Sequence, residues 1–221
     1  MVAGGSGRRF GGRKQFLPLA GHPVASWSVR AARTVADGVV LVVPDDDPAG
    51  AGDRLPAPGA SGDAAFGATA VVTGGATRAD SVRAGLAVVP AEAAVVVVHD
   101  AARPLAGPDL FAAVVDAVRA GDVDGAVPVV PVADTLKRVR GTRVVATVDR
   151  DELVAIQTPQ AFAADALRAA HANGGDATDD AGLLEAAGLP VGTVPGDPRN
   201  LKLTRPEDLA LAEALLAGAP T

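Results

Sequence analysis

The segment Val95-Val96-Val97-Val98-His99-Asp100-Ala101-Ala102-Arg103-Pro104 joins four valines to a polar turn. A short β-branched run of this kind indicates a strand buried on both faces of an open α/β sheet. Ligands of such sheets bind beyond the carboxyl ends of the strands, which is where Asp100 follows the valines. There its carboxylate could hold Mg²⁺ through one oxygen, while water and phosphate oxygens complete the shell. The alternatives for Asp100 are a helix cap or an ion pair with Arg103.

On both sides of this segment, short valine-rich runs alternate with helical patterns of alanine, leucine and arginine. This alternation predicts an α/β fold with a mainly parallel, twisted sheet flanked by helices, and residues 1–221 are interpreted as a single domain. Strands are predicted at 38–43, 70–72, 94–99, 126–130 and 191–194, and helices at 24–36, 78–89, 108–120, 163–172, 180–187 and 206–216.

Composition narrows the classes of function. Apolar residues make up 48% of the 221 residues and aromatic residues only 3%, so valine, leucine and alanine must form the core. The absence of cysteine excludes disulfides, thiolate metal sites and cysteine nucleophiles, and the three histidines are scattered. A net charge of −6 argues against a broad nucleic-acid surface. Since no apolar run could span a bilayer and no signal peptide is evident, we expect a cytoplasmic protein without a membrane partner.

The stretch from Ala3 to Gln15 is rich in glycine and basic residues. Its glycines let backbone N–H groups approach phosphate oxygens, and its arginines and lysine supply cations at the same place. It matches neither a Walker loop nor the dinucleotide fingerprint, and a flexible basic turn is the alternative. The candidate phosphate-binding residues here are Ala3, Gly4, Gly5, Gly7, Arg9 and Lys14.

Lysine is scarce, because 17 of the 20 basic residues are arginine and only Lys14, Lys137 and Lys202 remain. A coding bias toward arginine explains the ratio, and under it each lysine becomes a candidate for a position that needs a compact ammonium group. Lys202 is predicted to lie in a strand that enters the last helix. The alternative for it is an exposed surface lysine.

Two further segments are candidates for binding or assembly. Gly74 and Gly75 precede a helix with Asp80 and Ser81 in its first turn, where backbone groups and a hydroxyl can contact a base; a capped helix start is the alternative. Residues 134–158 contain a charged hairpin with a Gly-Thr turn, predicted to project as an arm. A two-stranded arm is barely stable alone, which predicts that it packs on another subunit.

Together these segments resemble the 2-C-methyl-D-erythritol 4-phosphate cytidylyltransferase family of the non-mevalonate isoprenoid pathway. The resemblance rests on eight segments in order along nearly the whole chain, which are 5–9 with 14–16, 74–82, 99–104, 134–138, 147–150, 157–160, 178–180 and 200–202. It implies a Rossmann-like nucleotidyltransferase fold, CTP and a small polyol phosphate as substrates, Mg²⁺ or another divalent cation, and a homodimer formed through the arm.

The resemblance also implies roles for individual residues. Cations would bind and neutralise the CTP phosphates. Glycines and the start of the following helix would surround the cytosine and ribose. Four further residues would hold the acceptor's phosphate, two of them from the neighbouring subunit. The implied residues are Arg9, Lys14 and Lys202 for the phosphates; Gly74, Gly75, Asp80 and Ser81 for the nucleoside; Asp100 for the metal; and Arg103, Thr135, Arg150 and Thr158 for the acceptor.

The chain departs from the family's pattern in two places. Arg13 stands where the family places a proline, and only Met1, Val2 and Ala3 precede Gly4 where the family has a longer strand. A central strand would then be nearly missing and its neighbours' backbone groups unpaired. We therefore hypothesise that the natural start lies several codons upstream. The alternatives to the activity itself are a ribitol-5-phosphate cytidylyltransferase and a non-catalytic nucleotide-binding homologue.

Overall fold

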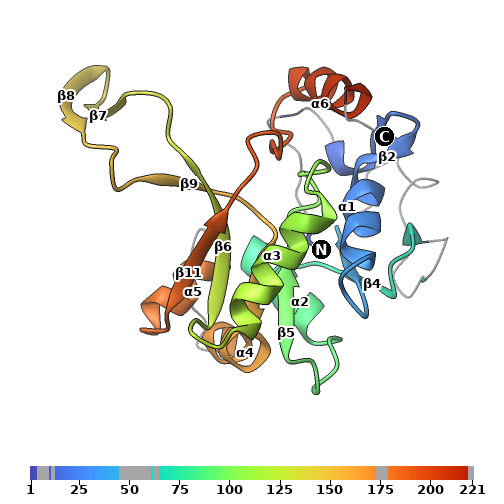
Figure 1. Cartoon of the computed structure of the whole chain (residues 1–221). Coiled ribbons are helices and arrows are strands. Elements are labelled where there is room, and N and C mark those ends of the chain that lie inside the picture. Colours follow the sequence, from blue (N-terminus) through green and yellow to red (C-terminus); the bar gives the residue numbers. More distant parts are fainter. Residues whose placement is uncertain (4–9, 11–12, 45–60, 62–64, 173–178, 219–221) are drawn as a thin grey trace.

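The computed structural model describes residues 1–3, 10, 13–44, 61, 65–172 and 179–218. Strands and helices alternate along the chain, as the sequence pattern predicts (Figure 1). The helices are α1 (Val24–Arg33), α2 (Arg78–Leu86), α3 (Pro108–Arg119), α4 (Ala164–Ala172), α5 (Asp180–Ala186) and α6 (Glu207–Ala217), with a short 3-10 helix η1 (Lys14–Phe16). The strands are β1 (Pro18–Leu19), β2 (His22–Pro23), β3 (Val40–Val43), β4 (Ala70–Thr73), β5 (Val95–Val98), β6 (Gly125–Pro131), β7 (Leu136–Arg140), β8 (Arg143–Val148), β9 (Val154–Ile156), β10 (Gln160–Ala163) and β11 (Val191–Pro195).

The central sheet is mainly parallel, as predicted. β3 pairs with β4 and β6 with β11 in parallel, whereas β10 lies antiparallel between β5 and β6. Val2 forms parallel bridges to Val42 on β3 and to Asp100 just beyond β5. The strand order is therefore β4–β3–Val2–β5–β10–β6–β11, and β9 adds an antiparallel partner to β6.

Residues 1–3 lie at the centre of this sheet. The Val2 N–H donates to the His99 carbonyl over 2.8 Å, and the Ala101 N–H donates to the Val2 carbonyl over 3.0 Å. On the other side, the Ala3 N–H donates to the Val42 carbonyl over 2.8 Å. The expectation that the neighbours of this segment would lack backbone partners is therefore wrong at these positions, while the hypothesis of an upstream start stays a prediction.

The amino group of Met1 is buried inside the sheet. It donates to the Val40 carbonyl over 3.0 Å, and burial lowers its pKa to about 6 although Asp100 acts to raise it. Next to it lies an apolar cavity of about 660 Å³, whose lining includes Val40, Val95 and Val97. At the carboxyl end of the sheet the backbone is instead paired on both sides of Val2, and this pairing fixes the place where β5 ends.

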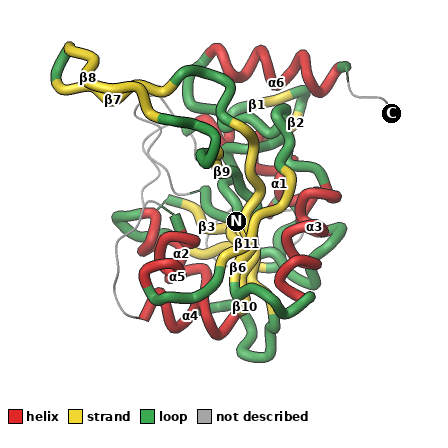
Figure 2. Tube along the Cα trace, turned by 60° about the vertical axis from the view of Figure 1, so that its left-hand side comes forward, coloured by secondary structure: helices red, strands yellow, loops and turns green. Residues whose placement is uncertain are grey.

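Helices cover both faces of the sheet: α1 and α3 on one, and α2, α4 and α5 on the other (Figure 2). The valines of β5 contact both layers, because Val96 and Val98 pack in the cluster of α4 and α5 whereas Val95 and Val97 pack against the α3 side. Helices therefore cover both faces of β5, but only Val96 and Val98 are buried, while Val95 and Val97 are half-buried. No helix in the described part of the chain is long and apolar enough to cross a bilayer.

The strands that sequence reasoning did not predict are β1, β2, β9 and β10. β10 holds the sheet together, since it pairs with β5 on one side and β6 on the other. In its sequence, Gln-Ala-Phe-Ala, only Phe162 favours a strand, so the local signal is weak there. Pairing on both edges and the complete burial of Phe162 stabilise the strand despite this weak propensity.

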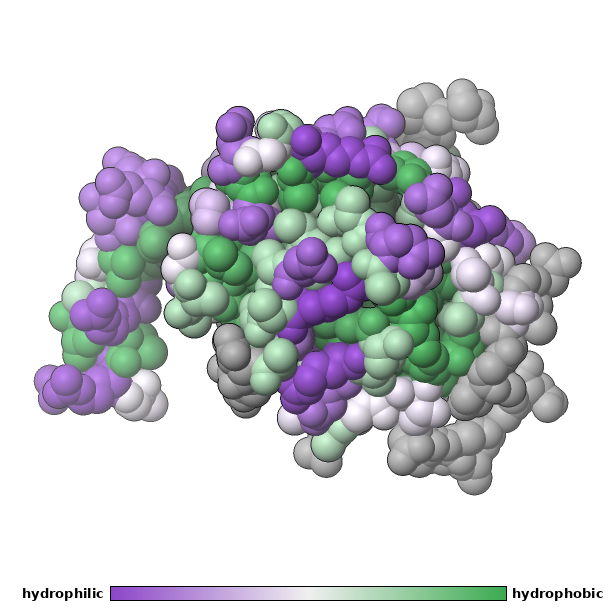
Figure 3. Space-filling model, turned by 90° about the horizontal axis from the view of Figure 1, so that it is seen from below, coloured by the Kyte–Doolittle hydropathy of each residue, from purple (hydrophilic) through white to green (hydrophobic). Residues whose placement is uncertain are grey.

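The predicted hairpin is confirmed, with β7 and β8 joined by a turn in which Gly141 has a φ of +58° that glycine adopts without strain. It projects from the body of the molecule (Figure 1). Among its charged residues the arm exposes the apolar side chains of Val139, Val144 and Val145, the largest fraction being 63% at Val144 (Figure 3).

Candidate functional site

Asp100 begins the turn that follows β5, and its carboxylate lies between two cations. Lys202 Nζ is 2.6 Å from Asp100 Oδ2, and Arg78 Nε is 3.5 Å from Asp100 Oδ1. Burial acts to raise the pKa of Asp100, but Lys202 and Arg78 outweigh it and lower that pKa to about 2. Asp100 is therefore an anion at neutral pH, at the edge of the sheet where ligands of such folds bind.

Lys202 reaches Asp100 from the segment between β11 and α6, and the prediction that this residue lies in a strand is wrong. The Leu203 N–H donates to the Ala102 carbonyl over 2.8 Å, so backbone pairing ties this segment to the turn after β5. The Lys202 side chain itself is 42% exposed. Asp100 and Lys202, which lie 102 positions apart in the sequence and are both candidate site residues, thus meet at this edge of the sheet.

Arg103 lies in the same turn and is held by the segment that carries Lys202. Its Nη1 donates to the Asn200 carbonyl over 2.8 Å, whereas its buried Nε has no hydrogen-bond partner among the described residues. Burial lowers the pKa of Arg103, against the attraction of Asp100. Asn200 is completely buried, and its side-chain amide donates to the Thr158 carbonyl over 2.9 Å.

Thr158 and His99 fix the turn from inside. The Asp100 N–H donates to Thr158 Oγ1 over 3.1 Å, and that hydroxyl lies 3.0 Å from His99 Nδ1. Burial lowers the pKa of His99 to about 3, so its ring is neutral. Since Nε2 lies 3.2 Å from the Arg103 carbonyl, Nε2 carries the proton and Nδ1 accepts from Thr158. Thr158, predicted as a substrate ligand, therefore also orients the backbone of Asp100.

The glycine pair before α2 closes tightly on the start of that helix. A Cβ on Gly74 would lie 2.6 Å from Ser81 Oγ, and one on Gly75 would lie 2.2 Å from the Cβ of Asp80. Asp80 forms a capping box with Thr77, and Ser81 Oγ accepts from the Gly75 N–H over 3.2 Å. The two helix residues, predicted to lie around the nucleoside, thus also have structural roles, because they stabilise the turn that carries the glycines.

Lys14 lies in η1, next to the central strand segment. Its neighbour Gln15 is buried and donates from Nε2 to the Ala3 carbonyl over 2.5 Å. Lys14 Nζ is 5.9 Å from the centroid of the Phe10 ring. The other predicted residues of the glycine-rich stretch, Gly4, Gly5, Gly7 and Arg9, lie outside the described residues.

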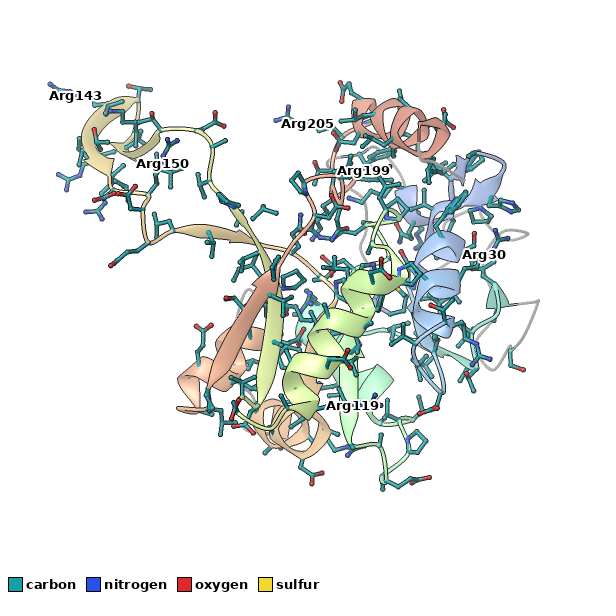
Figure 4. All side chains as sticks on the ribbon, in the orientation of Figure 1. Arg30, Arg119, Arg143, Arg150, Arg199 and Arg205 are labelled. Atoms are coloured by element: carbon teal, nitrogen blue, oxygen red, sulfur yellow. The ribbon has the colours of Figure 1, made fainter. Side chains whose placement is uncertain are left out.

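Thr135 and Arg150 lie together at the base of the arm, where both line a pocket between the strands. Arg150 Nη1 donates to the Ala133 carbonyl. Within one chain the arm carries Arg150 away from the body of the molecule (Figure 4). The structure therefore does not bring these two residues to Asp100 within a single subunit.

Sequence reasoning assigned no role to three further charged or titratable residues. Arg78, the first residue of α2, contacts Asp100 and also donates from Nη1 to Asp180 Oδ2 over 2.7 Å. Asp180 in turn lies 2.9 Å from His171 Nε2 of α4, and both of these side chains are buried. Arg78 and Asp180 lie in two of the segments on which the family resemblance rests, 74–82 and 178–180, so the sequence did mark these regions. Nothing in the sequence shows that the two side chains meet.

The surroundings of Asp100 fit a magnesium ion that also uses substrate oxygens. The described residues contain no group of three or more His, Cys, Asp or Glu side chains that could hold a metal. Mg²⁺ keeps several waters and is commonly bound through one or two carboxylates plus substrate phosphates. An ionised, partly exposed carboxylate beside a cluster of cations matches that pattern.

Comparisons with known proteins agree with the geometry. The family model described as IspD, 2-C-methyl-D-erythritol 4-phosphate cytidylyltransferase, matches residues 1–218. A 2-C-methyl-D-erythritol 4-phosphate cytidylyltransferase from Nocardia farcinica is 46% identical over 219 residues, covering 97% of this chain and 91% of the relative. A bifunctional enzyme IspD/IspF from Solidesulfovibrio magneticus is 46% identical over 235 residues, and the chain spans 57% of its length. The crystal structure of the cytidylyltransferase from Thermus thermophilus superposes with a TM-score of 0.78 at 35% identity, covering 98% of this chain and 96% of that one.

The ion pairs of Asp100 predict a specific dependence of stability on pH. Because the folded-state pKa is about 2 against a reference of 3.8, the charged carboxylate stabilises the fold above about pH 4, and this contribution is lost as pH falls toward 2. The contribution at neutral pH is about 2 kcal/mol. Urea unfolding of the wild type and of Asp100→Asn from pH 2 to pH 7 should show a difference in unfolding free energy that grows between pH 2 and pH 4. A difference that stays constant over this range would contradict the ion pairs.

Proposed function

The chain belongs to the 2-C-methyl-D-erythritol 4-phosphate cytidylyltransferase family, and we propose that it transfers CMP from CTP to 2-C-methyl-D-erythritol 4-phosphate. We place this reaction at the site around Asp100. The observation that carries this placement is the 2.6 Å ion pair between Lys202 and Asp100, which joins two segments of the family's pattern at the sheet edge. The products are 4-diphosphocytidyl-2-C-methyl-D-erythritol and pyrophosphate.

The reaction needs no covalent intermediate with the protein. An oxygen of the acceptor's phosphate forms a bond to the α-phosphorus of CTP in line, and the bond from that phosphorus to the bridging oxygen of the β-phosphate breaks. The electron pair of the broken bond leaves with pyrophosphate. Catalysis then consists of positioning the two anions and neutralising the charge that develops on the transferred phosphoryl group.

Asp100 would hold Mg²⁺, or another divalent cation, which neutralises phosphate charge when bound. Lys202 contacts the same carboxylate, and its exposed ammonium group can turn to the phosphates once the carboxylate has another cation. Lys14 and Arg9 are proposed to bind the phosphates as well. Ala3 and the glycines of both turns are proposed to surround the nucleotide, together with Asp80 and Ser81.

The acceptor's phosphate is proposed to contact Arg103 and Thr158 from the same chain. The guanidinium of Arg103 donates from Nη1 to the Asn200 carbonyl, and its Nε, although buried, has no partner among the described residues, so this cation is not paired with a carboxylate there. Thr158 Oγ1 already contacts the Asp100 N–H and His99, so a phosphate would replace or share one of these contacts.

Thr135 and Arg150 are proposed to act in a neighbouring subunit. Their position at the base of a projecting arm and the exposed valines of that arm support a homodimer in which each arm reaches its partner. Location in the cytoplasm stays a prediction.

The activity is tested by pyrophosphate release from each of the four ribonucleoside triphosphates, with methylerythritol phosphate or ribitol 5-phosphate as acceptor. We expect release only with CTP and Mg²⁺, and faster release with methylerythritol phosphate. Faster release with ribitol 5-phosphate would overturn the proposed acceptor. CTP binding without release would identify a non-catalytic homologue.

Replacement of Lys14 tests whether its cation acts in the transition state. We expect Lys14→Ala to lower kcat by about 10²–10³-fold, by analogy with the loss of one preorganised donor, with a much smaller change in the Kd of CTP. Arg33→Ala is the control, because Arg33 is an exposed cation at the end of α1 that donates to the Asp37 carbonyl, outside the proposed site. Equal losses in kcat and in CTP affinity would count against a transition-state role for Lys14.

A hybrid dimer tests whether the arm serves the partner's site. Arg150→Ala and Lys202→Ala should each be nearly inactive alone, whereas a heterodimer of the two contains one site with both native residues and should regain about half of the wild-type rate per dimer. Arg143→Ala, at the tip of the arm (Figure 4), is the control and should keep the wild-type rate. If the heterodimer stays inactive, Arg150 acts within its own chain.

A further inference from the structure

The two cations beside Asp100 are held in different ways. Lys202 contacts Oδ2 from an exposed segment, and Asp100 is the one hydrogen-bond partner that the structure gives its ammonium group within the described residues. Arg78 contacts Oδ1 with Nε, while Nη1 of the same guanidinium donates to Asp180 over 2.7 Å. Arg78 therefore bridges two carboxylates, and one of them lies behind the site.

Asp180 is a rigid anchor for that guanidinium. Its side chain is only 1% exposed, and His171 Nε2 contacts its second oxygen over 2.9 Å. Asp180 begins α5, His171 lies in α4 and Arg78 begins α2, so three helices on one face of the sheet meet at this point (Figure 2). A buried carboxylate needs a close cation, which makes it costly for Arg78 to leave Asp180.

The contacts with Asp180 and Asp100 also keep the Arg78 guanidinium protonated. Burial acts to lower the pKa of Arg78, but Asp180 and Asp100 outweigh it and raise that pKa. A planar guanidinium presents several donors in a fixed fork, so contact with Asp180 on one side sets the direction of Nε on the other. An ammonium group is a single point of charge and does not transmit an orientation in this way.

We propose that Arg78, held from behind by Asp180 and His171, is a positioning residue that orients the Asp100 carboxylate for the metal–nucleotide complex. Lys202 is the exchangeable cation of the pair, and Arg78 is the permanent one. If Asp100 held a metal ion in place of Lys202, Arg78 would keep its contact with the carboxylate and so its orientation. This inference rests on the proposed metal-binding role of Asp100.

A purely structural role for Arg78 would be limited to neutralising the buried Asp180. Arg78→Lys separates the two roles, since a lysine can neutralise Asp180 but cannot reach both carboxylates through a fixed fork. Asp180→Asn leaves Arg78 unchanged but removes the buried carboxylate that holds its guanidinium, so it tests the same positioning role without altering Arg78. Arg168→Lys is the matched control: Arg168 is about as exposed as Arg78, at 27% against 29%, and binds the Pro90 carbonyl over 2.8 Å away from the site.

The test measures binding of the Mn²⁺–CTP complex to the full chain by water proton relaxation, without acceptor and therefore without turnover. We expect Arg78→Lys and Asp180→Asn each to weaken binding by ~10-fold, as is typical when a partner of a metal ligand is lost. Thermal unfolding should show that Arg78→Lys is folded, and Arg168→Lys should bind as the wild type does. With Mg²⁺ in the activity assay, the two site variants should need more metal for half-maximal rate.

The outcomes separate this proposal from the proposed function. If Asp100→Asn binds Mn²⁺–CTP as tightly as the wild type, Asp100 is not the metal ligand. The proposed metal-binding role of Asp100 and the positioning role of Arg78 are then both wrong. If Asp100→Asn weakens binding while Arg78→Lys does not, the positioning role of Arg78 alone is wrong. An Arg78→Lys chain that fails to fold would assign the guanidinium to the fold and would also overturn the proposal.

Discussion

The arrangement of the molecule depends on one constraint: a single partly buried carboxylate, Asp100, must stay ionised beside the end of a buried strand. Desolvation alone would favour its neutral form. The two cations reverse that preference; Arg78 comes from the start of α2, the helix before β5, and Lys202 from a segment about a hundred positions later. The fold therefore has to bring the start of α2 and the segment before α6 to the same edge of the sheet.

The backbone of the turn after β5 is held more firmly than the side chains that surround it. Val2 pairs with the carbonyl of His99 and the N–H of Ala101, and Leu203 pairs with Ala102. Thr158 receives the N–H of Asp100. The N–H or C=O groups of four consecutive residues, His99 to Ala102, are paired in this way, so the backbone that carries the Asp100 side chain is held in place. The direction of the carboxylate itself depends on its contacts with Lys202 and Arg78. A backbone held in this way provides part of the preorganisation that electrostatic catalysis requires.

The sequence predicted what depends on local pattern. Four consecutive valines identified β5, and the position of Asp100 directly after them identified the ligand edge. Scarcity of lysine pointed to Lys202, which the structure places at that edge. Local pattern failed to predict β10, whose strand propensity is weak and rests on Phe162 alone; this strand forms because both of its edges are paired.

Side-chain partners could be predicted only where they are close in the sequence. For Asp80 a capped helix start was the alternative to a nucleoside contact, and the structure confirms the cap, because its carboxylate completes a capping box with Thr77, three residues earlier. The nucleoside contact stays a prediction. The contact of Arg78 with Asp180 spans 102 positions, and no local rule relates the two. The four residues of the glycine-rich stretch that lie outside the described part, including Arg9, stay predictions.

The division between fixed and exchangeable charges explains why one site can use cations from several remote segments. A substrate that carries several negative charges must displace existing ion pairs as it enters, and a pair can be displaced only if its cation is exposed and weakly anchored. Lys202 meets that condition, whereas Arg78 does not, because leaving Asp180 would strand a buried charge. Cations that contact only the acceptor have no carboxylate to orient and need no such anchor. The arm carries Arg150, which is proposed to contact the acceptor's phosphate, and the contact that the described residues give its guanidinium is one backbone carbonyl, that of Ala133.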